Sequence, residues 1–199
     1  MGFMAGEPQL RLVGSVASAP TDAELVLAAR SGNDEARQAL FNRHFHPLTQ
    51  FVSRLLAHSF EVEDVVQDTF VSVMAHLKSL KDPASFRAWM RMIAVSEVRR
   101  RLRRNRMLNR LGLREAEPVD LDSIVSDDTP PELKVELRQI FQLLRALPAD
   151  EAVALVLRRV EGLQLTEIAE QMDLSLATVK RKLGAAELHL SVLSGESHG

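Results

Sequence analysis

Cysteine is missing from this 199-residue chain, and aromatic residues make up only 5% of it. Without cysteine the protein forms no disulfide framework and no Cys-ligated zinc site, and a reducing cytoplasm fits this composition. The chain also lacks the Val/Ile/Thr alternation that is typical of β-strands, while 46% of its residues are hydrophobic. We therefore expect an all-α protein with one or two buried cores.

No apolar run is long enough to cross a bilayer. The run at residues 152–157 falls far short of the roughly 20 residues that a membrane-spanning helix needs. Residues 10–20 are weakly apolar, but Glu7 precedes them and no basic residue stands before them, unlike in a secretion signal. These features predict no membrane insertion, a cytoplasmic location and a mobile N-terminal tail over residues 1–20.

Residue patterns for catalysis or metal binding are also lacking. The sequence has no glycine-rich loop that could cradle a phosphate, and its histidines show no metal-ligand spacing with neighbouring carboxylates. We therefore expect neither an enzyme nor a protein that carries a metal or cofactor. The histidines are His44, His46, His58, His76, His189 and His198.

Charges of opposite sign are segregated along the chain, although the net charge is only -2. Arginines at the density of residues 99–114 repel one another unless anions compensate them, so we interpret this acid-free segment as a helix end that binds nucleic-acid phosphates. The alternative is a solvated helix end whose cations suit the helix dipole. We expect the acids that follow, within residues 115–136, to shield the arginines when DNA is absent. The arginines are Arg99, Arg100, Arg101, Arg103, Arg104, Arg106, Arg110 and Arg114.

Turn and capping signals divide the chain into two helical domains. We expect a first domain over residues 21–111 and a second, helix-turn-helix domain over residues 131–193. An acidic, flexible linker over residues 112–130 is expected to join them, and residues 194–199 are expected to form a C-terminal tail.

Hydrophobic periodicity predicts the individual helices. Thr21 and Glu24 have the spacing of a capping box at the start of a helix that ends near residue 30. A second helix is expected over residues 34–58, with a kink or a division at Pro47. The further helices are expected at 61–80, from 86 into the arginine-rich segment, and at 132–146, 149–161, 165–172 and 175–191.

The last two predicted helices have the spacing of a helix-turn-helix. Ser175 is placed to cap the second of them, and its buried stripe is expected to consist of Val179, Leu183, Ala186 and Leu190.

Four polar residues of this helix lie outside that stripe. We expect Arg181 to read guanine in a DNA groove, Thr178 to lie beside it, and Lys180 and Lys182 to contact phosphate. The alternative is a basic helix face that is merely solvated. Asp173 stands in the turn, where glycine is frequent, and aspartate tolerates the left-handed conformation better than most residues.

Three segments occur in an order that matches a known family. They are residues 63–70 (Glu-Asp-Val-Val-Gln-Asp-Thr-Phe), residues 85–94 (Ser-Phe-Arg-Ala-Trp-Met-Arg-Met-Ile-Ala), and the series Leu-Pro at 147–148, Val-Glu-Gly-Leu at 160–163 and Thr-Glu-Ile-Ala at 166–169. Over about residues 21–191 the chain resembles the extracytoplasmic-function (ECF) type of bacterial RNA polymerase sigma factor, within the sigma-70 family. The segment at 63–70 is the most specific of the three.

The resemblance implies a transcription initiation factor without catalysis of its own, which binds core RNA polymerase, directs it to promoters and assists their opening. The implied core-binding residues are Asp64, Gln67 and Asp68. The implied contacts to the minus-ten promoter element are Arg87, Trp89, Arg91, Arg99, Arg103 and Arg104, of which Trp89 also fits core packing. The implied contacts to the minus-thirty-five element are Thr178, Lys180, Arg181 and Lys182. An anti-sigma factor is a further candidate partner.

The two promoter elements set a distance that the domains have to span. Elements two helical turns apart lie about 70 Å from each other, and a linker of roughly nineteen residues extends to about 60 Å. We therefore expect two separate lobes on a tether. The linker is too short for the additional domain of larger sigma factors.

Some positions depart from the family pattern. Ser96 and Arg100 stand where asparagine and aspartate are frequent, Met74 stands where tryptophan is common, and Ala185 and Glu187 replace frequent arginines. The resemblance therefore does not specify the promoter sequence.

Two other functions fit parts of the same pattern. A sigma mimic would occupy an anti-sigma factor without directing transcription, although such proteins typically carry a receiver domain for which this chain has no room. A helix-turn-helix repressor would use the first domain only for dimerisation and would bind duplex DNA without polymerase.

Overall fold

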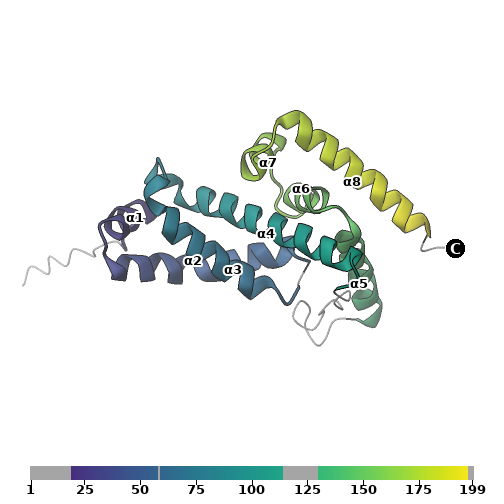
Figure 1. Ribbon diagram of the computed structural model, residues 1–199, viewed down its shortest axis with the longest axis horizontal. Coiled ribbons are helices and arrows are strands. Elements are labelled where there is room, and N and C mark those ends of the chain that lie inside the picture. The colour runs from purple at the N-terminus through teal and green to yellow at the C-terminus, as the bar shows by residue number, and fades with distance from the viewer. Residues whose placement is uncertain (1–18, 58, 114–129, 197–199) are drawn as a thin grey trace, which may run out of the picture.

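The structure is a computed structural model that describes residues 19–57, 59–113 and 130–196. These residues form helices and no strand, and the prediction of an all-α, two-domain protein is confirmed (Figure 1). Residues 1–18 of the N-terminal tail expected over 1–20, residues 114–129 of the expected linker and residues 197–199 of the expected C-terminal tail lie outside the described part of the chain. The elements are α1 (Asp22–Arg30), α2 (Asp34–Leu55), α3 (Val62–His76), η1 (Leu77–Ser79), η2 (Pro83–Ser85), α4 (Phe86–Arg110), α5 (Pro131–Ala146), α6 (Ala149–Arg159), α7 (Leu165–Met172) and α8 (Leu176–Glu196).

Local hydrogen bonds begin the first helices where the sequence predicts them. At the start of α1, the Glu24 backbone N–H donates to Thr21 Oγ1 at 3.3 Å and the Thr21 N–H donates to a Glu24 carboxylate oxygen at 2.7 Å, which completes the capping box. Asn33 caps α2 by accepting a hydrogen bond of 2.9 Å from the Ala36 N–H.

Two helices differ from the predicted ones. α2 is not divided at Pro47 and continues to Leu55. A proline inside a helix removes one backbone hydrogen bond, and here the flanking turns and the buried Leu48 and Phe51 hold the helix together across it. The helix predicted at 61–80 is also shorter, because α3 ends at His76 and the chain continues as the 3₁₀ turn η1.

Helices α1 to α4 surround the first part of the buried core. Leu40, Phe51, Val66, Phe86 and Val95 are all almost completely shielded from solvent. They come from α2, α3 and α4, so the amphipathic stripes that the periodicity predicts meet in one interior.

The second half of the chain is built around α6. Nearly the whole of this helix is buried, from Ala149 to Leu157 except for the half-buried Asp150. A helix that is buried on all sides needs neighbours on all sides, and α6 contacts α7 and α8 on the one hand and α2 and α4 on the other.

The helix-turn-helix has the predicted order. α7 ends at Met172, Asp173 takes the left-handed conformation with φ 51° and ψ 54°, and α8 follows. Ser175 caps α8 by accepting a hydrogen bond of 3.2 Å from the Thr178 N–H. α8 continues to Glu196, past the expected domain boundary at 193.

The two halves pack against each other and are not the separate lobes that promoter spacing led us to expect (Figure 1). Val153 and Leu157 of α6 and Ile168 of α7 belong to the same buried cluster as Phe51 and Val95. One layer of helices shields an apolar side chain from one side only. The side chains of α6 and α7 are therefore buried against the helices of the first half. Both helical halves nevertheless keep exposed polar faces.

Candidate nucleic-acid and polymerase interfaces

The three residues predicted to bind core polymerase lie on α3 but do not share one environment. Gln67 is exposed on the side of α3 that faces α2. Asp64, with 69% of its side chain exposed, and the half-exposed Asp68 lie toward α4, where Asp64 Oδ2 is 3.6 Å from Arg101 Nη1 and Asp68 Oδ2 is 3.3 Å from Arg100 Nη2.

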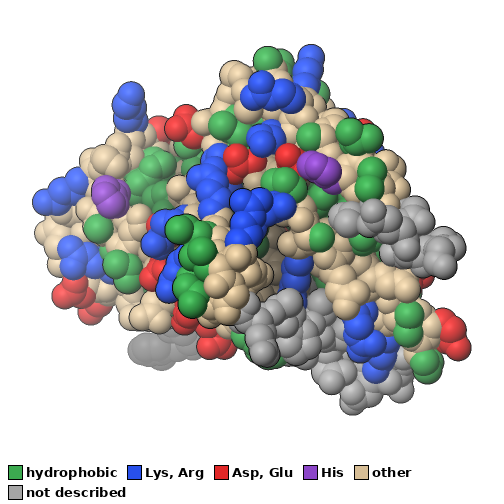
Figure 2. All heavy atoms as spheres, turned by 45° about the vertical axis from the view of Figure 1, so that its right-hand side comes forward, with side chains coloured by type: hydrophobic (Ala, Val, Ile, Leu, Met, Phe, Trp, Pro, Cys, Tyr) green, Lys and Arg blue, Asp and Glu red, His purple; other side chains and the backbone are tan. Residues whose placement is uncertain are grey.

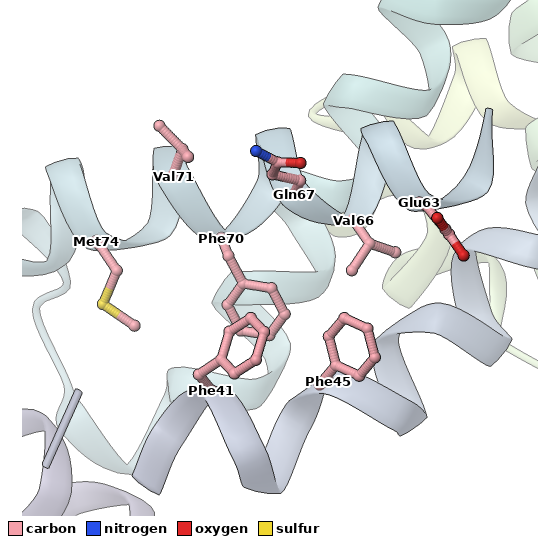
Figure 3. A pocket seen from close by; sticks show the side chains of 8 residues that line it. All are labelled: Phe41, Phe45, Glu63, Val66, Gln67, Phe70, Val71 and Met74. Carbon is pink, nitrogen blue, oxygen red and sulfur yellow. The ribbon is translucent and has the colours of Figure 1, made fainter. Parts of the chain in front are cut away.

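An apolar groove of about 740 Å³ lies between α2 and α3 (Figure 3). Phe41 and Phe45 of α2 face Phe70 of α3, with ring centroids of Phe41 and Phe70 4.7 Å apart. Phe45 is 42% exposed and Val71 is 64% exposed, so the groove leaves large apolar side chains in contact with water. Such a patch is typical of a protein-binding surface. The groove is lined by Phe41, Phe45, Glu63, Val66, Gln67, Phe70, Val71 and Met74.

Glu61 and Arg101 join α3 firmly to α4. Arg101 Nη1 donates to Glu61 Oε1 at 3.1 Å, and Asn105 also donates to the Glu61 carboxylate. Burial lowers the pKa of the Arg101 guanidinium, but the hydrogen bond and charge of Glu61, with Asp64 and Asp68, outweigh it and raise the pKa above its ordinary value. Arg101 is therefore a structural cation between two helices.

Arg87, in the first turn of α4, and Arg104, near its end, are predicted minus-ten contacts and are exposed. Trp89 lies between them in sequence and is half-buried against the core, with its ring centroid 6.4 Å from that of Phe86. Its position fits core packing, the second of the two roles that the sequence left open.

Three other predicted DNA contacts, Arg91, Arg99 and Arg103, are held by the second half of the chain. Arg91 Nη2 donates to Glu161 Oε2 at 2.7 Å. Arg99 Nε and Arg103 Nη2 both donate to Asp150 Oδ1, at 2.9 Å and 2.7 Å.

Arg99 and Arg103 favour the charged form of Asp150 in spite of its partial burial. Burial raises the pKa of its carboxyl, but the hydrogen bonds and charges of Arg99 and Arg103 outweigh burial, so the pKa lies below its ordinary value. Arg99 also donates to the backbone carbonyl of Met172 at 2.5 Å, at the C-terminal end of α7. Helix ends of this kind carry free carbonyls and a partial negative charge, which favour a cation.

Helix α8 presents the polar residues that the sequence predicts for DNA reading. Lys180 and Arg181 are exposed, and Val179 and Ala186 are completely buried beneath them. Lys182 is less free than expected, because its Nζ lies 3.8 Å from Glu151 Oε1 and only 28% of its side chain is exposed.

Thr178 is also less available than the sequence indicates. It is half-buried, and its hydroxyl lies 2.9 Å from that of Ser175. Arg181 and Lys180 are therefore the side chains that α8 offers most freely to a ligand.

Basic side chains are prominent across the middle of the face in Figure 2, with acidic side chains between them. The sequence did not identify Asp150 and Glu161 as partners of the arginines and proposed the acids at 115–136 instead. Residues 115–129 of that stretch lie outside the described part of the chain. A sequence pattern carries no signal for the observed pairing, because Glu161 is 70 residues away from Arg91.

Two negative findings concern the described residues alone. None of the helices placed by the structure is both long enough and apolar enough to span a membrane. Over the same residues, no group of three or more acidic or histidine side chains is arranged to hold a metal ion.

Two regions of the sigma-70 family match the chain, one in each half. Sigma-70 region 2 matches residues 40–107, which run from α2 to α4. Sigma-70 region 4 matches residues 137–190, which run from α5 to α8.

Curated relatives match most of the chain. The ECF RNA polymerase sigma-E factor of Escherichia coli K12 is 32% identical over 170 residues, which cover 82% of this chain and 88% of the relative. RNA polymerase sigma factor CnrH of Cupriavidus metallidurans is 32% identical over 182 residues, which cover 87% of this chain and 95% of the relative.

Solved structures share the fold. CnrH in complex with the cytosolic domain of CnrY has a TM-score of 0.55 and 28% identity, with 88% of this chain and 97% of that one covered. The sigma factor RpoE in complex with the anti-sigma factor NepR from Bartonella quintana has a TM-score of 0.58 and 22% identity, with 79% and 96% covered. With both regions present in order and relatives matched over nearly their full length, the chain belongs to the sigma-70 family, as an ECF RNA polymerase sigma factor.

Proposed function

We propose that this chain binds core RNA polymerase through α3, contacts the minus-ten promoter element through α4 and reads the minus-thirty-five element through α8. The observation that carries the proposal is that an apolar groove at α3 and an exposed basic face at α8 occur in one chain that belongs to the sigma-70 family. The chain acts as an initiation factor in the cytoplasm, and the polymerase performs the chemistry.

The core-binding surface comprises Asp64, Gln67 and Asp68 together with the groove beside them. Gln67 lines this groove, and Val71 stands 64% exposed one turn farther along α3. Apolar side chains of the polymerase would bury this patch, and the acidic Asp64 at its side would favour a basic partner surface.

The promoter contacts divide between the two domains. The proposed contacts to the minus-ten element are Arg87, Trp89, Arg91, Arg99, Arg103 and Arg104. The proposed contacts to the minus-thirty-five element are Thr178, Lys180, Arg181 and Lys182. Arginine and lysine contacts to phosphate supply affinity, while a bidentate arginine contact to guanine supplies sequence selection. We assign residues 21–111 to the first domain and residues 131–196 to the second, because α8 continues past the expected boundary at 193. Residues 112–130 are the proposed linker, and residues 1–20 are the proposed N-terminal tail.

Run-off transcription with purified core polymerase tests the proposal directly. Promoters are first selected from genomic fragments by the complex of this chain with core enzyme. We expect defined transcripts that require the chain. Failure to stimulate transcription from any selected fragment contradicts the proposal, and strong duplex binding without core enzyme would indicate a repressor.

A protein that inhibits sigma factors is a second proposed partner. Solved sigma factor structures similar to this chain contain such a protein or another bound chain: the anti-sigma factor NepR in one, the cytosolic domain of CnrY in the other. Co-purification of this chain from its own cell extract, followed by mass spectrometry, identifies the partner. A chain that captures only an inhibitor and never polymerase would be a sigma mimic.

A further inference from the structure

One carboxylate of α6 is buried beneath α8, the helix that the proposed function assigns to the minus-thirty-five element. Glu151 stands in the first turn of α6 and is only 5% exposed. Its Oε2 lies 2.7 Å from His189 Nδ1, and its Oε1 lies 3.8 Å from Lys182 Nζ. His189 and Lys182 are about two helical turns apart on α8 and therefore lie on the same side of it. Glu151 thus contacts α8 at two points.

A buried carboxylate needs compensation for the water that it loses. The first turn of a helix carries a partial positive charge, and α8 supplies two further groups. Because a carboxylate only accepts hydrogen bonds, Nδ1 of His189 carries the hydrogen and donates it to Glu151 Oε2. This hydrogen bond holds the carboxylate in one orientation and leaves Oε1 to Lys182.

The ammonium group of Lys182 can lie toward Glu151 or toward the surface. Ala186, one turn farther along the same side of α8, is completely buried, so Lys182 stands at the edge of the buried face. In the structure its ammonium group lies toward Glu151, and only 28% of the side chain is exposed. The two residues before it, Lys180 and Arg181, are exposed. The cation of Lys182 is therefore drawn away from the surface that these two residues form.

The position of this cation matters for DNA binding. A lysine that contacts a phosphate releases a counterion, and each such contact adds about 0.9 to the slope of log K against log salt concentration. A phosphate has to compete with Glu151 for the ammonium group of Lys182, because the carboxylate already compensates its charge. Phosphate contacts carry no sequence information directly. Holding Lys182 back therefore lowers the affinity for a duplex of any sequence.

We infer that Glu151 is a positioning residue that withholds Lys182 from DNA, so that α8 binds a duplex mainly through Lys180 and Arg181. The inference rests on the proposed contact of α8 with DNA. It also ranks the two lysines of that surface, because Lys182 then contributes less to DNA affinity than Lys180.

Glu151→Gln removes the charge and keeps the shape of the side chain. Its matched control is Glu170→Gln, because Glu170 is an exposed acid on α7 and both substitutions change the net charge of the second domain equally. Thermal unfolding shows whether each variant keeps the fold. Comparing the two variants separates release of Lys182 from a general gain of positive charge.

Binding of a fluorescent duplex of mixed sequence to the full chain, over a series of low salt concentrations, gives the first readout. We expect Glu151→Gln to bind at least about threefold more tightly than the wild type, with a salt slope that is steeper by about 0.9, the value for one phosphate contact. Glu170→Gln is expected to keep the wild-type slope. Equal slopes for the two variants overturn the inference.

Adding Lys182→Ala to each variant tests how the effect arises. The gain from Glu151→Gln should disappear without Lys182, because the two residues act as a pair. Any gain from Glu170→Gln should remain, since independent sites contribute additively. A gain from Glu151→Gln that persists in the Lys182→Ala background overturns the inference.

Single substitutions of the two lysines test the inference without changing Glu151. Lys182→Ala is expected to weaken duplex binding less than Lys180→Ala does, because only the ammonium group of Lys182 is held by a carboxylate beneath α8. Equal or greater weakening by Lys182→Ala overturns the inference. This comparison decides the question even where Glu151→Gln does not fold.

Limited acetylation of the lysines, measured by mass spectrometry, tests the position of Lys182 without DNA. We expect Lys182 to react more slowly than Lys180 in the wild type. Glu151→Gln should bring the two rates together, and Glu170→Gln should leave them apart. Equal rates in the wild type overturn the inference even if the chain binds DNA. Slow reaction of Lys182 in a chain that binds no duplex, with or without polymerase, contradicts the proposed function alone.

Discussion

Arg91 and Glu161 stand 70 residues apart in the sequence and are joined by a hydrogen bond of 2.7 Å from Arg91 Nη2 to Glu161 Oε2. The same arginine lies over the ring of Phe51, so it is fixed by an anion on one side and an aromatic face on the other. This contact joins the two domains at the surface that the proposed function assigns to DNA.

The apolar groove on α3 predicts where polymerase binding can be disrupted without unfolding the chain. Val71→Asp places a charge in the groove at a position that is already 64% exposed. Burying that charge under a partner is costly, so we expect core polymerase to bind at least about tenfold more weakly. Affinity is measured by titrating labelled core enzyme.

Ala75→Asp is the control for that substitution, because Ala75 is exposed on the same helix and does not line the groove. It is expected to leave the affinity unchanged. Equal weakening by both variants would mean that charge on α3, and not the groove, governs binding.

Arg181 is expected to carry sequence selection at the minus-thirty-five element. Arg181→Ala removes an exposed guanidinium from α8, and loss of a bidentate contact to guanine costs about 1–3 kcal/mol of discrimination. Lys180→Ala is expected to weaken binding to all sequences alike, because it removes a phosphate contact. Competition binding with duplexes mutated at single positions measures both effects. A uniform loss for Arg181→Ala would assign this residue to phosphate instead.

The contact between the domains is expected to weaken in acid. The pKa of Asp150 is lowered in the folded chain, so its contribution is complete above the ordinary value of 3.8 and is lost as the pH falls through the lower folded value. The difference in the free energy of unfolding between the wild type and Asp150→Asn should therefore shrink below about pH 3.8. Denaturant unfolding at several pH values measures it, with Glu187→Gln as an exposed control. A difference that persists in acid would show that charge is not its origin.

The shared interior predicts that a substitution in α6 destabilises the chain strongly. Leu157 is fully buried, and Leu157→Ala is expected to cost about 2–5 kcal/mol because it leaves a cavity. Leu188→Ala, at a side chain that is 65% exposed on α8, is expected to change stability by no more than about 0.5 kcal/mol. Thermal and denaturant unfolding give both values. A small effect at Leu157 would mean that α6 repacks around the loss.

Several elements of the fold were predictable because their causes are local. The capping box of Thr21 and Glu24, the cap at Ser175 and the stripe that contains Val179 and Ala186 depend on residues three or four positions apart. The left-handed turn at Asp173 follows from the same short range. The family was recognisable for a related reason, because its sequence motifs are short segments in a fixed order.

Some features of the structure were predicted wrongly or not predicted at all. These features depend on contacts between side chains that local sequence patterns do not indicate. Of the kink or division expected at Pro47, the division does not occur, because packing of the flanking turns outweighs one lost hydrogen bond. The groove between α2 and α3 exists only because Phe41, Phe45 and Phe70 meet across two helices. No periodicity within either helix indicates this meeting.

Helix positions, the polar face of α8 and the family follow from the amino-acid order alone, since interactions within a few residues determine them. Which arginines are free and which are held is a matter of the docking of α6 and α7 against α4. Arg104 is exposed and Arg99 is not, although both come from the same basic run. The physical reason is that charge pairing depends on distance in space, and the carboxylates of Asp150 and Glu161 reach the arginines only when the apolar faces of the two domains are buried together.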